Sequence, residues 1–405
     1  MLAGALAGAL VWTGSGRLSD GHERAPNVVA AVSTPAPATA ADPSATERPP
    51  DRGVRAPSRR IWVSVATLRR RPMAGAAWKA LVKAARLDRG PANVSDQDSS
   101  HDVVTLAAAL VCARTASPRF CAKARTGVVQ AIGTERGGRW LAVGRNLTGY
   151  VIAADLVDLR AGRGPGSAGS RVEAWIRGFL TERLAQDNTG EPVPLAPFAS
   201  GSNASAQEGA AYAAVAAYLA DRPALDRAWD AFRTFACDPS APDRERIDLH
   251  RGVEAEWAFD DRHPCAINPA GGAKRIEGRH GAGEVHRVDG AIINDMARGG
   301  DYKWPPGATG YPWVGLEGIV PAAVILHRAG YPAFTIADRA VLRAVRFLWD
   351  LRVATRRRNW FPDRRSSEIV QLVNVVYGTR FPVQRPVAGG RTVGYTDWSH
   401  ATWPG

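Results

Sequence analysis

The sequence contains few segments that alternate apolar and polar residues as a β-strand does. The clearest are VVQAI (128–132) and EIVQLVNVVY (368–377), and both also fit the period of a helix. The spacings typical of zinc fingers, helix-turn-helix motifs and Walker-type phosphate loops are absent. A sheet-based fold is therefore disfavoured, and no motif points to nucleotides or nucleic acid.

Aromatic residues are not interleaved with the most basic segments. Arginine clusters at 69–71 and 356–358, but neither cluster has the aromatic pattern of an RNA-binding sheet. Arginine is otherwise spread along all 405 residues, and the formal net charge is +13. Such a charge reflects either general composition or an anionic partner. We expect no nucleic-acid partner, whereas an acidic polysaccharide is compatible with the charge.

Hydrophobic runs long enough to cross a bilayer, which takes about 20 residues, are also missing. The apolar segment LAGALAGALVW (2–12) is shorter than that, and no basic stretch precedes it. Residues 1–24 are therefore predicted to be a signal peptide or the remnant of a membrane anchor. Residues 25–59 are rich in Pro, Ala, Ser and Thr, which predicts a disordered linker. We expect a secreted protein or one of the periplasm or cell envelope.

Cysteine is scarce, with four residues in the whole chain and no CxxC pair. The absence of that pair disfavours a zinc site, and we expect no metal. An even number of cysteines in an exported chain indicates disulfides. Proximity in the sequence favours Cys112–Cys121 and Cys237–Cys265, each of which would contribute about 2–4 kcal/mol.

Helical periods dominate the chain from residue 60 onward. Apolar residues recur at three- and four-residue steps in Ala74–Arg86, Val103–Ala116, Pro118–Gly133, Arg139–Leu159, Ser170–Ala185, Ala204–Ala220, Arg222–Ala236, Tyr311–Ala329 and Ile336–Val353. The succession predicts one all-α domain over residues 60–405. Its antiparallel helix pairs can close into an incomplete (α/α) toroid or barrel with long functional loops. The irregular stretch 238–306 is the main candidate for such a loop.

Helix ends carry recognisable signals. Asp102 precedes VVTLAAAL, and Asn203 or Ser205 precedes AAYAAVAAYL, so these residues are predicted to lie at helix N-termini as caps. Gly330 follows the predicted helix at Tyr311–Ala329, where a glycine ends helices.

The stretch from residue 287 to 330 holds the densest group of side chains suited to chemistry. It combines carboxylates, cations and aromatic rings in a loop that leads into an apolar helix; they are Asp289, Asp295, Arg298, Tyr302, Trp304, Tyr311, Trp313 and Glu317. An acidic sugar chain needs this combination. A cation meets the sugar carboxylate, aromatic faces meet the rings, and a phenol or carboxylate moves a proton.

DGAIINDMARGG (289–300) followed by GYPWVGLEGIVPAAVIL (310–326) resembles the core of the alginate lyase family. Asp289, Gly290 and Arg298 match the family run, and Asp295 is one step from the usual acid. Ile293 and Asn294 depart from the family's Leu-Pro pattern. A tyrosine then opens the apolar helix, after a longer insert than the family has.

SGSNASAQEGAAYAAVAAYLAD (200–221) is similar to a second family segment, in which an Asn-His pair begins a helix. Asn203 matches the asparagine, but Ala204 stands where the histidine is expected. The resemblance implies an α/α-toroid polysaccharide lyase, a carbon–oxygen lyase that cleaves a uronate-containing, alginate-like glycan by β-elimination without a cofactor. Without that histidine, either Tyr311 supplies both acid and base or His286, His280 or His250 supplies the base.

The resemblance further implies catalytic roles for side chains that neutralise the uronate carboxylate, namely Asn203 and Arg298, and an acid/base role for Tyr311. Further candidates are assigned to substrate binding by their polarity or aromatic faces: Asp289, Trp304, Trp313, Arg145, Asn146, His101 and Glu317. Among them, Arg145 and Asn146 lie in an otherwise apolar helix and are predicted to line the inside of the toroid.

Structural roles compete with each of these assignments. Tyr311 could anchor a loop, Arg298 could form a salt bridge, Asn203 could be only a helix cap, and Asp289 could be only a turn residue. Two other functions also remain open. A glycoside hydrolase on the same toroid would use two of Asp289, Asp295 and Glu317. A non-catalytic glycan-binding protein of the cell envelope would need no acid or base.

Overall fold

Helices form most of the structure, a computed structural model that describes residues 60–162, 164–181, 183–185, 192–242, 256–259, 265–278, 281–356, 360–361 and 366–403. The predicted signal or anchor segment and the predicted linker lie outside these residues, as do His250 and His280. The helices are α1 (Val65–Arg70), α2 (Gly75–Arg86), α3 (His101–Thr115), α4 (Pro118–Ala131), α5 (Trp140–Leu156), the 3-10 turn η1 (Leu159–Ala161), α6 (Ala168–Gly178), α7 (Asn203–Leu219), α8 (Arg222–Phe235), α10 (Ile293–Ala297), α11 (Tyr311–Arg328), α12 (Ile336–Thr355), α13 (Ser367–Tyr377) and α14 (Thr396–Ser399).

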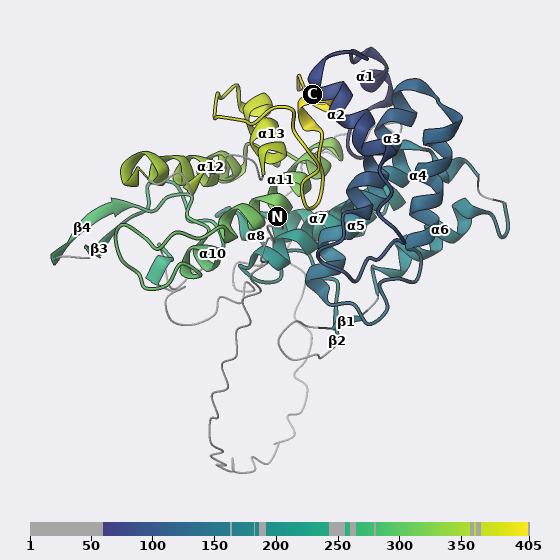
Figure 1. The fold of residues 1–405 in the computed structure, drawn as a ribbon. Coiled ribbons are helices and arrows are strands. Elements are labelled where there is room, and N and C mark those ends of the chain that lie inside the picture. Colours follow the sequence, from purple (N-terminus) through teal and green to yellow (C-terminus); the bar gives the residue numbers. More distant parts are fainter. Residues whose placement is uncertain are drawn as a thin grey trace, which may run out of the picture. The chain divides into compact units, whose positions relative to one another are not determined.

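Two kinds of helix alternate along the chain. Helices α3, α5, α7 and α11 are buried along nearly their whole lengths, and their small and apolar residues occur on every side. Helices α4, α6, α8 and α12 bury only one side, because polar residues occupy the other. The first set therefore forms the core of the fold, and the second set covers it. Figure 1 shows α7 and α11 together in the middle of the described part.

Contacts between glycines and backbone bring three core helices into close register. A Cβ on Gly318 of α11 would overlap the backbone of Ala206 and Gln207 in α7, and a Cβ on Gly144 of α5 would lie 2.9 Å from the backbone nitrogen of Glu208. Only glycine permits these approaches. They place the N-terminal half of α7 beside the N-terminal halves of α5 and α11, and because Gly315 also lies near Asn203, α7 and α11 run in the same direction.

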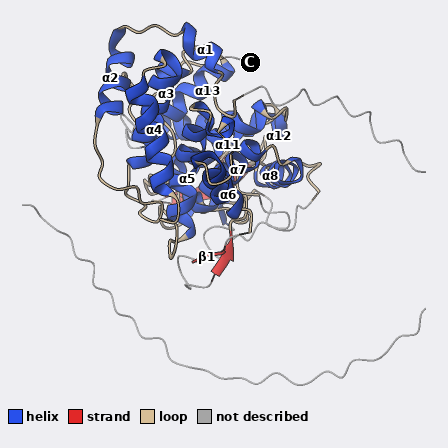
Figure 2. Ribbon diagram, turned by 90° about the vertical axis from the view of Figure 1, so that its right-hand side faces the viewer, coloured by secondary structure: helices blue, strands red, loops and turns tan. Residues whose placement is uncertain are grey.

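Strands are short and lie outside the helical core. β1 (Arg183–Ala185) pairs antiparallel with β2 (Pro192–Pro194), and β3 (Ala273–Gly278) pairs antiparallel with β4 (Gly281–Arg287). Figure 2 shows β1 at the edge of the helices, and Figure 1 shows the β3–β4 hairpin near α12. These two strands lie within the stretch that the sequence predicts to be a long irregular loop, so that prediction is corrected for residues 273–278 and 281–287.

The predicted all-α class is confirmed, with a few local corrections. Residues 183–185, predicted to end a helix, form β1 instead, and the segment after residue 64 forms α1. EIVQLVNVVY belongs to α13, which settles its ambiguous pattern in favour of a helix. Gly330 follows α11 with a φ of 103°, as predicted.

Two predicted N-terminal caps are wrong. Asp102 lies inside the first turn of α3, and Asn203 is the first residue of α7 rather than its cap. The cap of α7 is Ser202, whose hydroxyl accepts a hydrogen bond from the backbone N–H of Ser205 at 3.3 Å. The side chain of Asn203 is consequently available for another partner.

The predicted cysteine pairs are confirmed. Cys112 and Cys121 form one disulfide across the loop between α3 and α4, and Cys237 and Cys265 form the other. The second ties the end of α8 to the segment that precedes β3. Among the described helices, none combines the length and the apolar character that a membrane span requires.

The close contact between α7 and α11 predicts that Gly318→Ala destabilises the protein. The added methyl group has to push two backbones apart, and overpacking of this kind costs roughly 1–3 kcal/mol. The matched control is Gly178→Ala at the end of α6, where a Cβ would meet nothing within 4 Å. Urea unfolding followed by circular dichroism measures both variants. An unchanged midpoint for Gly318→Ala would contradict the register described here.

Candidate functional site

A buried hydrogen bond joins α7 to α10. The Asn203 amide nitrogen donates to Asp295 Oδ1 at 2.8 Å, and the two residues are 6% and 0% exposed. A Cβ on Gly315 of α11 would lie 2.5 Å from Asp295 Oδ2 and 3.8 Å from the Cβ of Asn203. The absence of a side chain at Gly315 therefore makes room for the carboxylate, and three helices meet at this point.

A cation and a phenol lie next to this bond. The Arg298 guanidinium carbon lies over the Tyr311 ring, 4.9 Å from its centroid. Arg298 is the C-cap of α10, three residues after Asp295, and Tyr311 begins α11, four residues before Gly315. Residues spaced by three or four lie on the same side of a helix. The stacked pair is thus one helical turn, about 5 Å, beyond the buried hydrogen bond.

We call the group Asn203, Asp295, Arg298 and Tyr311 the junction. Its two inner members are buried, whereas Tyr311 is 42% exposed and Arg298 is also exposed. The phenol is therefore accessible to a large molecule, and the ring does not anchor a loop by burial in the core. The long helices α7 and α11 both begin at the junction. Their backbone N–H groups favour an anion at this place.

A second polar group lies deeper in the core. Arg145 Nε donates to Gln207 Oε1 at 3.3 Å, and Gln207 Nε2 donates to the Val314 carbonyl at 3.2 Å. Glu317 Oε1 accepts a hydrogen bond from the Ser366 hydroxyl at 2.8 Å. Gln207 is one turn beyond Asn203 in α7, so this group lies directly beneath the junction.

Charges in this interior group are desolvated. Burial lowers the pKa of Arg145, and the positive charge of Arg391 lowers it further. Arg391 Nε lies 3.7 Å from Glu317 Oε2. Burial raises the pKa of Glu368, in the first turn of α13, well above its usual value, and the charge of Glu317 adds to this shift. The guanidinium group of Arg145 and the carboxyl groups of Glu317 and Glu368 are thus buried, whereas Arg391 is partly exposed and approaches Glu317 from outside. The pKa of Glu368 favours its neutral form.

Two predicted substrate ligands have structural partners instead. The Asn146 amide nitrogen donates to the carbonyls of Val94 and Asp96 at 3.0 and 2.7 Å, and the side chain is fully buried. His101 Nδ1 lies 2.8 Å from the Tyr150 hydroxyl, and burial lowers the pKa of this imidazole. Asn146 therefore fixes the loop before α3.

Trp313 also lies inside the protein. Its indole nitrogen donates to the carbonyl of Trp360 at 3.1 Å, its ring meets Phe361 edge-on with centroids 4.9 Å apart, and only 4% of the residue is exposed. Trp313 is thus a packing residue of α11, and its side chain presents little surface to a sugar ring.

The remaining predicted residues gather in a cavity between α12 and the β3–β4 hairpin. His286 and Trp304 stack with ring centroids 3.9 Å apart, and Asp289 forms an ion pair with Arg287 at 2.7 Å. All four side chains line a cavity of about 620 Å³, which we call the α12 cavity. Burial lowers the pKa of His286. Asp289 lies in the turn after β4, as its alternative assignment predicted.

The predicted site thus separates into three groups. The junction unites Asn203, Arg298 and Tyr311, the interior group contains Arg145 and Glu317, and the α12 cavity contains His286, Asp289 and Trp304. Sequence analysis missed Gln207, Glu368 and Arg391. Gln207 and Glu368 could have been found as polar residues inside apolar helices. The residues around Arg391 in the sequence give no comparable signal. Among the described residues, no three His, Cys, Asp or Glu side chains gather as metal ligands would.

Neither models of known protein families nor curated proteins give a match to this chain. The resemblance to alginate lyases therefore depends on the motifs alone, and the positions of their side chains in the fold become the main argument about function.

The interior carboxyl pair predicts a pH-dependent effect of Glu368→Gln. The folded-state pKa of Glu368 is raised, whereas the unfolded chain releases this proton near pH 4.3. The contribution of Glu368 to stability is therefore present below about pH 4.3 and is lost as pH rises towards the folded-state pKa. Glutamine does not ionise, so the variant gains stability relative to the wild type by up to about 1.4 kcal/mol per pH unit.

Urea unfolding between about pH 4.5 and 7.5 measures this difference. Glu277→Gln, which removes an exposed carboxylate of β3, is the control for the loss of one negative charge. A difference between Glu368→Gln and the wild type that stays constant over this range would show that Glu368 is not held in its neutral form.

Proposed function

We propose that the protein is a polysaccharide lyase that cleaves a uronate-containing glycan by β-elimination at the junction. The observation that carries the proposal is the Arg298–Tyr311 stack, one helical turn from the Asn203–Asp295 hydrogen bond. The amide, the guanidinium and the phenol that the family resemblance selects come from three helices and meet in one place. Chance matches to a short motif would have no reason to converge in this way.

Neutralisation of the sugar carboxylate is the first requirement of the reaction. The C5 proton of a uronate becomes more acidic when hydrogen bonds or cations take up the carboxylate charge. Asp295 accepts one N–H of Asn203 and so orients the amide, whose second N–H donates to the substrate. Arg298 adds a positive charge, and the N-terminal turns of α7 and α11 favour the anion.

Proton transfer is the second requirement, and Tyr311 is the group placed for it. As the phenolate, Tyr311 accepts the C5 proton, and the phenol so formed donates that proton to the leaving glycosidic oxygen. The C4–O bond breaks while a C4=C5 double bond forms, so the reaction needs no redox partner. Ala204 follows Asn203 in α7 and supplies no imidazole. His286 stacks on Trp304 in the α12 cavity, so we assign both proton steps to Tyr311.

The finer fold and the location belong to the same proposal. Largely buried core helices alternate with covering helices, and the N-terminal half of α7 lies beside the N-terminal halves of α5 and α11. This arrangement is what an incomplete (α/α) toroid requires, with the junction at one end of its inner helices. Two disulfides favour a secreted or cell-envelope protein.

The direct test uses alginate, glucuronan and other polyuronates. The wild-type protein should release unsaturated products that absorb ultraviolet light. Folded protein without such absorbance on any uronate would reject the lyase. Reducing sugar released without absorbance would instead favour the glycoside hydrolase. Its candidate carboxylates have different surroundings: Asp289 pairs with Arg287, Asp295 binds Asn203, and Glu317 binds Ser366.

Tyr311→Phe is expected to reduce kcat by roughly 10²–10⁴-fold, because it removes the acid/base oxygen and keeps the ring. Affinity for the polymer should change little. Tyr302→Phe is the matched control, because it removes a phenolic hydroxyl from the same loop. Burial and the charge of Glu256 raise the pKa of Tyr302 to about 12, which makes this phenol a poor base. Equal activity of Tyr311→Phe and wild type would remove Tyr311 from the mechanism. Glycan binding without turnover in either form would favour the non-catalytic alternative.

Arg298→Gln is expected to lower kcat by roughly 10²-fold, as the loss of one group that stabilises developing charge does. Arg298→Lys keeps the charge but not the planar stack on Tyr311, so its activity should be intermediate. Arg69→Gln, which removes an exposed charge from α1, controls for net charge. Steady-state kinetics separate kcat from KM. An effect on KM alone would assign Arg298 to binding rather than to the chemical step.

A further inference from the structure

We propose that the α12 cavity is a second binding site, which holds one uronate sugar of the polymer without cleaving it. The choice of a sugar acid rests on the proposed function. Four guanidinium groups, three carboxylates and a stacked His–Trp pair surround this one cavity of about 620 Å³. Ligand sites in proteins commonly have volumes of about 300–1,000 Å³.

One side of α12 forms a charged wall. Arg343, Arg346 and Asp350 line the cavity and recur at spacings of three and four residues, which places them on the same side of the helix, and Arg339 in the turn before them lines the cavity too. Phe347 also lines the cavity and is buried. The wall is therefore charged along its rim and apolar at its base, as a site for an amphipathic sugar ring requires.

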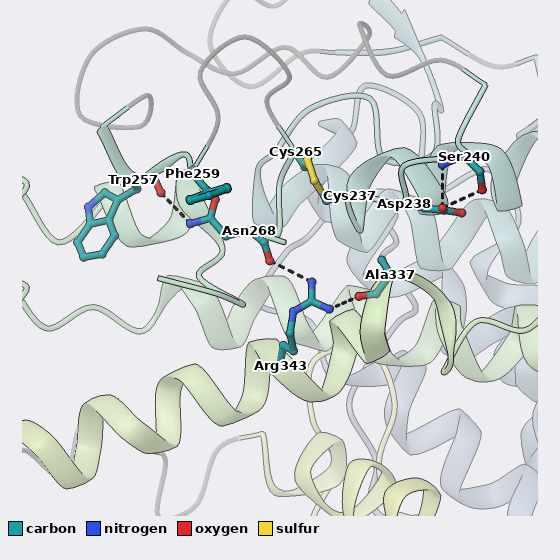
Figure 3. The surroundings of a disulfide bond; sticks show 9 residues. All are labelled: Cys237, Asp238, Ser240, Trp257, Phe259, Cys265, Asn268, Ala337 and Arg343. Atoms are coloured by element: carbon teal, nitrogen blue, oxygen red, sulfur yellow. Dashed lines mark hydrogen bonds between the residues drawn. A yellow bond between two sulfur atoms is a disulfide. The ribbon is translucent and has the colours of Figure 1, made fainter. Parts of the chain in front are cut away.

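Arg343 is the fixed cation of this wall. Its guanidinium donates to the carbonyl of Asn268 at 3.0 Å and to that of Ala337, as Figure 3 shows. It also donates to the carbonyl of Asp338 at 2.8 Å. Burial lowers the pKa of Arg343. Its Nε is buried and has no hydrogen-bond partner in the part of the chain that the structure describes. One donor of a desolvated cation thus remains unused.

The carbonyl that holds Arg343 is itself immobilised. The Asn268 amide nitrogen donates to the carbonyls of Trp257 and Val288 at 2.8 and 3.0 Å, and its Oδ1 accepts from the backbone N–H of Phe259 at 2.9 Å. Figure 3 shows this network close to the Cys237–Cys265 disulfide. Arg343 is therefore set in place before any ligand arrives, which reduces the entropic cost of binding.

Two further cations of the wall, Arg339 and Arg346, are exposed. No hydrogen bond or ion pair joins the guanidinium of Arg339 or Arg346 to another described residue. Residues Ala337, Asp338 and Arg339 have φ values of 45°, 52° and 59°, a left-handed turn that non-glycine residues rarely adopt. This turn carries Arg339 to the cavity rim at a conformational cost, and such costs concentrate at ligand sites.

The charge balance of the lining selects a singly charged ligand that also carries hydroxyl groups. Four arginines against three aspartates leave one positive charge, since burial lowers the pKa of His286 and favours its neutral form. Burial raises the pKa of Asp350, and the charge of Asp289 adds to the shift, so a dianion would meet two repelling carboxylates. A sugar acid instead offers its carboxylate to the guanidinium groups and its hydroxyls to the aspartates.

The stacked pair offers a flat face for the sugar ring. The rings of His286 and Trp304 are inclined by only 14°, and the apolar C–H face of a pyranose packs against such a surface. Trp304 belongs to the loop between Arg298 and Tyr311, and its backbone N–H donates to the Glu277 carbonyl of β3 at 2.9 Å. One loop therefore connects the cavity to the junction, so that a polymer bound in the cavity is tethered near the reacting groups.

The test measures binding in the Tyr311→Phe background, where the substrate stays intact. Short oligosaccharides of mannuronate, glucuronate and galacturonate are titrated calorimetrically, together with the same sugars after reduction of their carboxylates to alcohols. Arg346→Gln should weaken binding of the preferred oligosaccharide roughly tenfold or more, because it removes a charge-assisted hydrogen bond. Trp304→Ala should weaken binding similarly, Trp304→Phe should restore most of it, and Arg69→Gln should have no such effect.

The outcomes separate this proposal from the lyase activity. Unchanged affinity in both Arg346→Gln and Trp304→Ala would overturn the cavity site even if the wild type cleaves uronates. Equal binding of the reduced, neutral sugars would overturn it too, as would equally strong competition by inorganic phosphate. If binding depends on Arg346 and the wild-type protein produces no unsaturated product, the cavity site is supported and the lyase is rejected.

Discussion

The close approach of α7 and α11 is the constraint on which the rest of the structure depends. Gly318 lies against the backbone of Ala206, so the two helices run side by side in a fixed register. That register sets Gly315 opposite Asn203 and leaves room for the Asp295 carboxylate between them. The position of Tyr311 one turn earlier in α11 then follows from helix geometry. A shift of either helix by one residue would separate the side chains of the junction.

The packed core helices also enclose charged side chains. Taking carboxylates and guanidinium groups out of water is costly, and an interior that contains Arg145, Glu317 and Glu368 has to compensate them by mutual contact or by protonation. The raised pKa of Glu368 favours protonation of this carboxyl group. The hydrogen bond from Ser366 compensates the carboxylate of Glu317 by direct contact. The N-terminal turns of the core helices lie nearby and favour negative charge. Such an interior positions groups for chemistry more readily than it adds stability.

Local patterns in the sequence predicted the helices but not how side chains meet across them. Periodicity indicated the core helices and a glycine the end of α11, because these signals depend on neighbours in the chain. The hairpin β3–β4 was missed, since its residues are charged and glycine-rich and show no alternation. The cap of α7 was assigned to Asn203 or Ser205 instead of Ser202, and only the fold shows that Asn203 is paired with Asp295. A convergence of Arg298 and Tyr311 was expected from a family motif, yet no local pattern encodes it.

A polymer-cleaving enzyme has to solve two problems that compete for the same side chains. The reacting sugar needs a strongly positive, partly buried site, whereas the rest of the polysaccharide has to bind weakly enough to be released. A pure arginine surface would hold a polyanion too tightly for release. The α12 cavity mixes four arginines with three aspartates, which leaves one positive charge, equal in size and opposite in sign to the charge of one sugar acid. The loop from Arg298 to Tyr311 carries Trp304 to that cavity, so the proposed binding site and the proposed cleavage site use different groups on one connected segment.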